Sequence, residues 1–309
     1  MKIFYVGQES VPFVQQDINM LREQHTVSVF DMSGMTHPLW GAPRFILYVI
    51  GASRLLRKSD IIWCWFADYP VLPFMLIGKL FCKRIVIFIG DYELQNEPAI
   101  QYGNQRFRVR GAITRWILRN ADAILVPSPQ EITIVRDVEA RAAPVTMVPW
   151  YVDEEEFIGR IPKTDLIATA TFSKFSEMRK GIPIFIESTT ALPHKSRVLT
   201  SVSREEYIKT LQRAKVYCQL TYPPCESFGV SLLEAMYCGC VPVITPCEAM
   251  EWVMGGSGHV VPYGDIEKTR DAIIKAFRTS GEPARKRARE FTKENRREII
   301  KNLISQLSV

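Results

Sequence analysis

The sequence predicts an α/β protein built from two doubly wound domains. Its 309 residues exceed the roughly 150 residues of a typical domain. Short runs of β-branched and aromatic residues recur along the chain, and stretches with helical periodicity separate them. The runs do not alternate in polarity, which suits parallel strands covered on both faces. Two successive series of such β-α units predict two domains that face each other across a cleft.

The first series predicts an N-terminal domain over residues 1–149. Its expected strands are 3–6, 27–30, 61–65, 85–89, 123–126 and 145–148. The second series predicts a C-terminal domain over 150–309, with strands at 166–171, 197–200, 216–220, 241–245 and 259–261 and helices at 205–214, 230–238 and 266–278. We expect a final helix, about 284–309, to pack back on the N-terminal domain. Ligands of such folds bind at the carboxyl ends of the strands.

The excess positive charge is clustered. Lys and Arg number 39 against 33 Asp and Glu, which gives a net charge of +6. The segment 106–119 carries five arginines and no acid, and it predicts a surface that faces anions, such as a phosphorylated acceptor or an anionic membrane. The basic run 283–301 also contains glutamates at helical spacing, so we interpret it as a solvated helix.

Several function classes lack their motifs. The 7 cysteines include no Cys-x-x-Cys, and the four histidines show no His-Glu-x-x-His, so we expect neither disulfides nor a zinc site. No Asp-x-Asp, Gly-x-Gly-x-x-Gly or P-loop occurs, and we expect no cofactor and no metal. The N-terminus lacks the layout of a signal peptide and no apolar stretch is long enough to span a bilayer, which predicts a cytoplasmic protein.

The segment 226–244 carries the expected chemistry. Gly239 ends a helix, so Gly229 marks its start, where the backbone N–H groups of Phe228, Gly229 and Val230 form an anion site. Glu226 and Glu234 are then about 10 Å apart along the axis. This spacing suits a nucleotide-diphosphate sugar, with sugar hydroxyls at the first carboxylate, phosphates at the helix start and ribose hydroxyls at the second. Alternatively, Ser231 and Glu234 form a capping box.

The motifs in this segment resemble a known family. Glu-x-Phe-Gly at 226–229, Glu-Ala-Met at 234–236 and Gly-x-x-Pro-Val-Ile at 239–244 are similar to the Glu-x7-Glu signature of glycosyltransferase family 4, whose members are retaining enzymes of GT-B fold. Residues 173–181 resemble the family's Gly-Arg-x5-Lys-Gly, with Ser173 and Lys174 in place of the Gly and Arg. The resemblance implies a donor site formed by Gly7, Lys174, Lys180, Glu226, Ser227, Phe228, Gly229, Val230, Ser231 and Glu234.

The N-terminal half departs from the family at two positions. Many members carry paired glycines after the first strand, where this chain has the single Gly7. Relatives often place His-Asp after the fourth strand, where this chain has Gly90 and Asp91. The resemblance implies that Asp91 orients the acceptor hydroxyl or the transferred sugar, and a turn-capping role is the alternative. Lys180, Lys174, Glu226 and Asp91 are the expected catalytic residues.

The resemblance implies a metal-independent, retaining glycosyltransferase. Its expected donor is a uridine or guanosine diphosphate sugar, and its expected acceptor is a glycan, a lipid-linked or a small molecule. Two alternatives stay open: a catalytically silent nucleotide-sugar-binding protein, which the departures at Gly7 and Gly90 favour, and an epimerase of the same architecture. An RNA-binding role is weaker, since the segment 106–119 resembles no nucleic-acid module.

Overall fold

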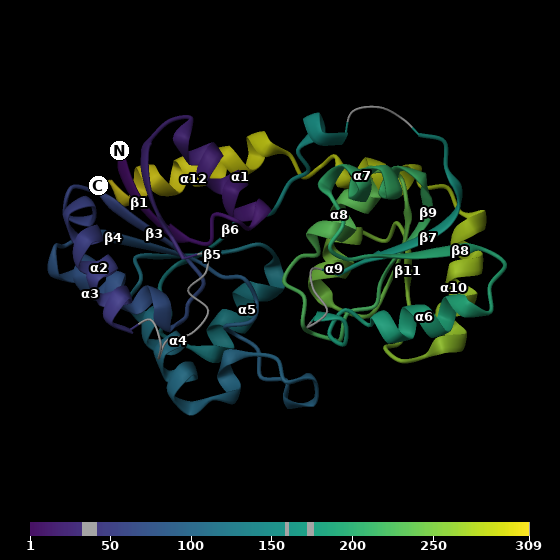
Figure 1. The fold of residues 1–309 in the computed structure, drawn as a ribbon, viewed down its shortest axis with the longest axis horizontal. Coiled ribbons are helices and arrows are strands. Elements are labelled where there is room, and N and C mark those ends of the chain that lie inside the picture. The colour runs from purple at the N-terminus through teal and green to yellow at the C-terminus, as the bar shows by residue number, and fades with distance from the viewer. Residues whose placement is uncertain (33–41, 158–160, 172–175, 309) are drawn as a thin grey trace. The chain divides into compact units, whose positions relative to one another are not determined.

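The computed structural model describes the whole chain except residues 33–41, 158–160, 172–175 and 309. The chain divides into two compact units. The first contains Met1–Val148 together with Ile300–Val309, and the second contains Pro149–Ile299. Figure 1 shows a parallel sheet with helices on both faces in each unit. The α/β class predicted from the sequence is therefore confirmed.

The first unit is built on a parallel sheet of six described strands in the order β2-β1-β3-β4-β5-β6. The unalternating runs bury apolar residues on both faces of the sheet, with Phe4, Ile62 and Ile87 in the core on one face and residues such as Tyr5 and Trp63 buried on the other. The strands are β1 (Lys2–Gly7), β2 (Thr26–Asp31), β3 (Ile61–Trp65), β4 (Arg84–Phe88), β5 (Ala123–Val126) and β6 (Val145–Met147). The helices are α1 (Pro12–Arg22), α2 (Ala42–Arg57), α3 (Leu72–Leu80), α4 (Arg108–Asn120) and α5 (Pro129–Val138), with short turns η1 (Tyr69–Val71), η2 (Pro98–Ile100) and η3 (Asn104–Arg106).

The second unit contains a parallel sheet of five described strands in the order β11-β10-β9-β7-β8. Its strands are β7 (Thr164–Ala170), β8 (Lys195–Leu199), β9 (Ala214–Gln219), β10 (Val241–Ile244) and β11 (His259–Val260). Its other elements are η4 (Glu154–Phe157), α6 (Ile182–Thr190), α7 (Arg204–Arg213), α8 (Val230–Tyr237), α9 (Glu248–Met254), α10 (Ile266–Arg278) and α11 (Glu282–Ala288), and α12 (Lys293–Leu307) begins here. Side chains cap the starts of α7 and α10: Ser203 accepts a hydrogen bond from the Glu206 amide, and Asp265 accepts one from the Lys268 amide.

The last part of the chain differs from the expected single helix. Residues 282–307 form two helices, α11 and α12, which residues 289–292 separate. The basic tail is also only partly solvated. Arg296 is 1% exposed, lies 3.9 Å from the Trp150 ring centroid and donates to the Pro149 carbonyl. A guanidinium in contact with an aromatic face and a carbonyl replaces part of its lost hydration, which explains this burial.

Strand order places two loops of the second unit next to each other. β7 and β9 are neighbours in the sheet and run parallel, so the loops that follow their carboxyl ends leave the sheet at the same edge. The loop after β7 leads to Lys180, and the loop after β9 leads to Glu226 and the start of α8. The topology thus brings together two motifs that are 46 residues apart in sequence.

Candidate functional site

Lys180 and Glu226 form an ion pair at the carboxyl edge of the second sheet. The Lys180 ammonium donates to Glu226 Oε2, and the side chains are 11% and 12% exposed. Gln219, the last residue of β9, donates from Nε2 to the same oxygen at 2.9 Å. Ser231 Oγ in turn donates to Gln219 Oε1 at 3.1 Å. A hydrogen-bond chain therefore connects Lys180 to the first turn of α8.

A second cation lies beside Glu226. Arg179 Nη1 is 3.7 Å from Glu226 Oε2 and donates to the Cys225 carbonyl at 2.6 Å. Burial disfavours the ionised Glu226 carboxyl, but the charges of Lys180 and Arg179 outweigh burial and hold its pKa below the ordinary value. Glu226 is therefore ionised at neutral pH, and the two cations are fixed around it. Arg179 and Gln219 were not predicted as site residues, although Arg179 directly precedes Lys180.

Helix α8 begins and ends at the two glycines that the sequence singled out. Gly229 has φ of 88° and precedes Val230, the first helical residue, and Gly239 has φ of 77° after the last turn. The first residues of a helix have no intrahelical acceptor for their N–H groups. Within the described residues, no backbone acceptor contacts the amides of Phe228, Gly229 and Val230. Amides without an acceptor at a helix N-terminus can bind an anion, and the anion site expected here from the sequence stays a prediction.

Only the backbone of Phe228 is available to a ligand. Its side chain is 1% exposed and lies with ring centroids 6.1 Å from Trp252 and 5.6 Å from Phe291. This packing fixes the peptide groups that lead into α8. Ser227 is also buried, at 8% exposed.

Glu234 is held by two residues of α7. Arg204 Nη2 donates to Glu234 Oε1 at 2.7 Å, and the Tyr207 hydroxyl donates to Oε2 at 2.7 Å. The carboxylate is 7% exposed. The alternative capping box with Ser231 is wrong, because the N-cap of α8 is Gly229. Arg204 and Tyr207 are three residues apart on one helix, but only the packing of α7 against α8 shows that both reach Glu234.

Arg204 is itself fixed by neighbours on three sides. It donates from Nε to Glu156 at 3.0 Å, and its guanidinium carbon is 5.4 Å from the Phe157 ring centroid and 5.2 Å from that of Tyr207. Burial lowers the pKa of Arg204, but Glu234 and Glu156 reverse that effect and raise it, so the cation is permanent. A permanent cation between aromatic faces holds Glu234 in one orientation.

Some of the residues predicted for the donor site lie outside the described part of the chain, and one lies in the first unit rather than the second. Ser173 and Lys174 lie outside the described residues. Gly7 lies in the first unit, at the end of β1, where its carbonyl accepts from the Met32 amide at 2.8 Å. A Cβ at Gly7 would lie 2.9 Å from a Tyr5 ring atom, so the close packing of this strand end explains the glycine.

Asp91 lies in a tightly hydrogen-bonded loop of the first unit. It is 4% exposed, and its oxygens accept from Gln95 Nε2 and the Tyr102 hydroxyl at 2.7 Å each. Gly90 precedes it where relatives often have His. A Cβ there would lie 2.5 Å from a Phe66 ring atom, so Phe66 fills the space that a histidine would need.

Glu93 organises the same loop and was not predicted. Its carboxyl is fully buried and accepts the amides of Ala67, Gly90 and Asp91 at 3.1 Å each. Burial raises the pKa of Glu93 to about 7, although these backbone hydrogen bonds lower it. The Gly-Asp-Tyr-Glu sequence contained this residue, but nothing local distinguished it from a surface acid.

The described residues contain no cluster of three or more His, Cys, Asp or Glu side chains placed to bind a metal ion. Among the described helices, none combines the length and the apolar character that crossing a bilayer requires.

Comparison with known proteins finds a family model for part of the second unit and similar folds for the whole chain. Residues 187–297 match the family model of glycosyl transferases group 1, which covers α8 and both glutamates. No curated protein sequence matches the chain significantly. The fold is similar to a sucrose-phosphate synthase from Thermosynechococcus elongatus, with 15% identity, a TM-score of 0.80 and 99% of each chain covered.

Two further structures share the fold. HepE of Anabaena, in complex with UDP and glucose, has 14% identity and a TM-score of 0.76, with 99% of this chain and 100% of that chain covered. A UDP-forming α,α-trehalose-phosphate synthase from Burkholderia xenovorans, in complex with glucose-6-phosphate, has 13% identity and a TM-score of 0.66 over 99% and 100% of the chains. The fold is thus the GT-B fold, and residues 187–297 of the second unit match the model of glycosyl transferases group 1, which supports an enzyme of the glycosyltransferase class.

Proposed function

We propose that this protein transfers a sugar from a nucleotide-diphosphate sugar to an acceptor hydroxyl, with retention of anomeric configuration and without a metal ion. The observation that carries the proposal is the placement of the Lys180–Glu226 pair and the carboxylate of Glu234 around α8. This arrangement combines a cation, an open helix N-terminus and two fixed carboxylates in one unit.

In this proposal the diphosphate binds at the start of α8. Departure of the sugar leaves negative charge on the diphosphate, and preorganised cations and N–H donors stabilise that charge most where water is excluded. Lys180 and Arg179 are held in place by Glu226 and the Cys225 carbonyl, so little reorganisation is needed when charge develops. We assign Lys174 to the same anion on the motif that it shares with Lys180.

The two glutamates recognise hydroxyl groups in this proposal. Ionised carboxylates only accept hydrogen bonds, and each oxygen accepts more than one. Glu226 accepts from the sugar, and Glu234 accepts from the ribose with the lone pairs that Arg204 and Tyr207 leave available. Ser227, Phe228, Gly229 and Val230 contribute backbone groups, and Ser231 acts through Gln219.

The acceptor side is assigned to the first unit. Both carboxylate oxygens of Asp91 accept hydrogen bonds, from Gln95 and Tyr102. We therefore propose that Asp91 positions the loop 91–102 and that this loop contacts the acceptor. Gly7 allows the close packing at the end of β1 in this view.

An assay of product formation tests the proposal. The protein is incubated with uridine and guanosine diphosphate sugars and a panel of glycan and small-molecule acceptors. UDP-glucose comes first, because the HepE structure contains UDP and glucose. Transfer should give a product of retained configuration by NMR, with no loss in EDTA. Donor binding without transfer or hydrolysis indicates a silent binder, and interconversion of nucleotide sugars indicates an epimerase.

A matched pair of variants links the activity to the site. Lys180→Ala should lower turnover about 100-fold if the ammonium meets charge that develops in the transition state. Lys275→Ala, on the exposed side of α10, should leave turnover unchanged. Unchanged turnover in a folded Lys180→Ala variant would defeat the assignment.

We also propose that one face of the first unit binds anionic membranes. Leu76, Leu80, Phe107 and Val109 are exposed on α3 and at the start of α4. Arg108 lies among them and lines an apolar pocket of about 580 Å³. Within the segment 106–119, Arg110, Arg115 and Arg119 contact Asp68, Gln105 and Glu139, which leaves Arg106 and Arg108 for lipid headgroups. Apolar side chains beside cations suit the bilayer interface.

Vesicle sedimentation tests this surface. The wild-type protein should sediment with vesicles that contain phosphatidylglycerol and stay in solution with phosphatidylcholine alone. Leu80→Ser combined with Val109→Ser should abolish sedimentation, while Ile274→Ser, at an exposed apolar residue on α10, should preserve it. Equal sedimentation of the double variant would exclude this face.

A further inference from the structure

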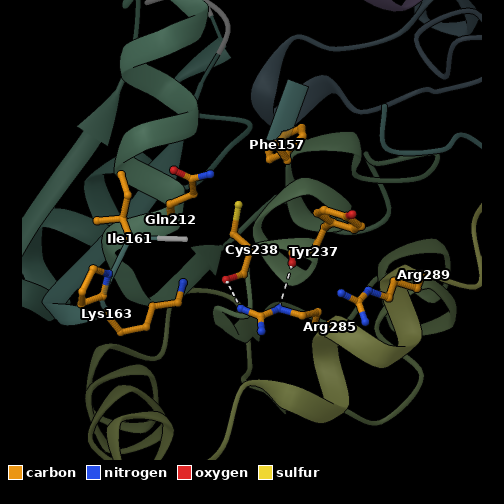
Figure 2. Close-up of a pocket in the computed structure, with 9 residues that line it drawn as sticks. Phe157, Ile161, Lys163, Gln212, Tyr237, Cys238, Arg285 and Arg289 are labelled. Carbon is orange, nitrogen blue, oxygen red and sulfur yellow. Dashed lines mark hydrogen bonds between the residues drawn. The ribbon is translucent and has the colours of Figure 1, made fainter. Parts of the chain in front are cut away.

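A second pocket lies in the C-terminal unit, at the opposite end of α8 from the proposed diphosphate site. Its volume is about 500 Å³, and Tyr237 and Cys238, at the end of the helix, line it. Eight residues of α-helix span about 12 Å. Figure 2 shows the side chains of Lys163, Arg285 and Arg289 around this pocket. Neither Lys180, Glu226 nor Glu234 lines it, so it is distinct from the donor site.

The pocket is positively charged. Lys163 donates from its ammonium to the carbonyls of Leu211 at 3.1 Å and Ala214 at 2.6 Å, which are neutral groups. Arg289 lies 6.0 Å from the Tyr237 ring centroid. In the part of the chain that the structure describes, neither cation forms an ion pair with a carboxylate. Glu154 and Arg289 both interact with Tyr237, so one acid lies beside the aromatic wall, although it does not line the cavity.

Arg285 adds a third cation in a fixed orientation. It donates from Nε to the Tyr237 carbonyl at 3.2 Å and from Nη2 to the Cys238 carbonyl at 3.0 Å, as the dashed lines in Figure 2 show. Its Nη1 donates to Glu282 at 2.6 Å. A guanidinium has five N–H donors, so two remain after these three contacts. The nine described lining residues include no acid.

The other wall of the pocket is aromatic. Phe157 and Tyr237 pack edge to face with their ring centroids 5.7 Å apart, and both line the cavity. Pockets that bind organic ligands have volumes of about 300–1,000 Å³ and combine apolar walls with a few placed polar groups. The cavity is far larger than an inorganic ion needs, so its shape and lining fit an anion that carries an organic ring.

We propose that this pocket binds a small organic phosphate, with the phosphate at Arg285 and Arg289 and the ring against Phe157 and Tyr237. The ligand binds outside the donor site, because none of Lys180, Glu226 and Glu234 lines the pocket, although Phe157 contacts both the pocket and Arg204.

Calorimetric titration with phenyl phosphate tests the site, without UDP, because UDP is itself an organic phosphate that carries a ring. Phenyl phosphate should bind the wild-type protein, and it should bind Lys180→Gln equally tightly. Arg289→Gln should weaken binding at least tenfold. Arg289 is exposed and supports no carbonyl, so this variant should fold, which a melting curve checks. Lys286→Gln, an exposed residue of α11 that does not line the pocket, should bind like wild type.

Three results would overturn the proposal. The first is the absence of binding to the wild-type protein. The second is binding that Lys180→Gln abolishes and Arg289→Gln leaves unchanged, because phenyl phosphate would then occupy the diphosphate site. The third is inorganic phosphate binding as tightly as phenyl phosphate, because the aromatic wall would then contribute nothing.

Discussion

The Tyr207 hydroxyl donates to Glu234 Oε2 at 2.7 Å, and this contact joins α7 to α8 beside the proposed nucleotide site. Tyr207 is half-buried, and desolvation followed by the charge of Glu234 raises its pKa well above the ordinary value. The phenol therefore remains a hydrogen-bond donor at all physiological pH values. In the proposed donor complex, this contact determines which lone pairs of Glu234 are left for the ribose.

Removal of that hydroxyl should weaken donor binding without changing the chemical step. Tyr207→Phe removes one hydrogen bond to a charged group, worth about 1.5–3 kcal/mol. We expect KM for the donor to rise roughly tenfold, with kcat nearly unchanged, in steady-state kinetics. Tyr69→Phe, in the first unit, should leave KM for the donor unaffected. A fall in kcat with unchanged KM would assign Tyr207 to the reaction step instead.

Gly181 joins the predicted Lys-Gly motif to α6 and should tolerate no side chain. Its φ is 63°, and an added Cβ would lie 2.0 Å from the Leu220 carbonyl oxygen. Gly256 has φ of 76° and nothing within 4 Å of such a Cβ. Gly256→Ala should therefore cost about 1–2 kcal/mol for the left-handed backbone alone, and Gly181→Ala clearly more. Urea unfolding measures the free energy of unfolding of both variants. Equal decreases would show that the backbone near Leu220 moves to accommodate the added Cβ at little cost in stability.

Glu93 should make the stability of the first unit depend on pH. Its pKa is about 7 in the folded chain and 4.5 without burial, so between these values the unfolded chain binds fewer protons. Stability therefore falls as pH rises through this window, by about 3 kcal/mol in total, and is level above pH 7.

The variant Glu93→Gln isolates this effect. The variant has no carboxyl to titrate at this position. Its free energy of unfolding minus that of the wild type should therefore be larger at pH 8, where the wild type is less stable, than at pH 5. Urea unfolding at both pH values measures the difference. No difference between the two pH values would mean that the three amide donors keep the carboxylate ionised throughout.

The sequence predicted the strands because buried parallel strands leave a local pattern. Runs such as 61–65 and 123–126 coincide with β3 and β5, and α10 occupies the expected 266–278. Gly229 and Gly239 predicted both ends of α8, because a positive φ at a helix terminus selects glycine. These signals are contained within a few residues of one another.

Contacts between distant residues could not be predicted in the same way. Lys180 and Glu226 were each expected at the donor, but their mutual pairing depends on β7 and β9 being neighbours. Arg204 and Tyr207 reach Glu234 through helix packing, and Glu93 is distinguished from a surface acid only by its burial. The charged residues around Arg296 in the sequence likewise give no indication that its side chain is buried.

The dissociation constant of UDP, measured by calorimetry for wild type, Lys180→Gln and Lys275→Gln, tests the central claim most directly. A charge-assisted contact with the diphosphate predicts affinity about 10–100-fold weaker for Lys180→Gln and unchanged for Lys275→Gln. Wild-type affinity in a folded Lys180→Gln variant would contradict the placement of the diphosphate at the start of α8.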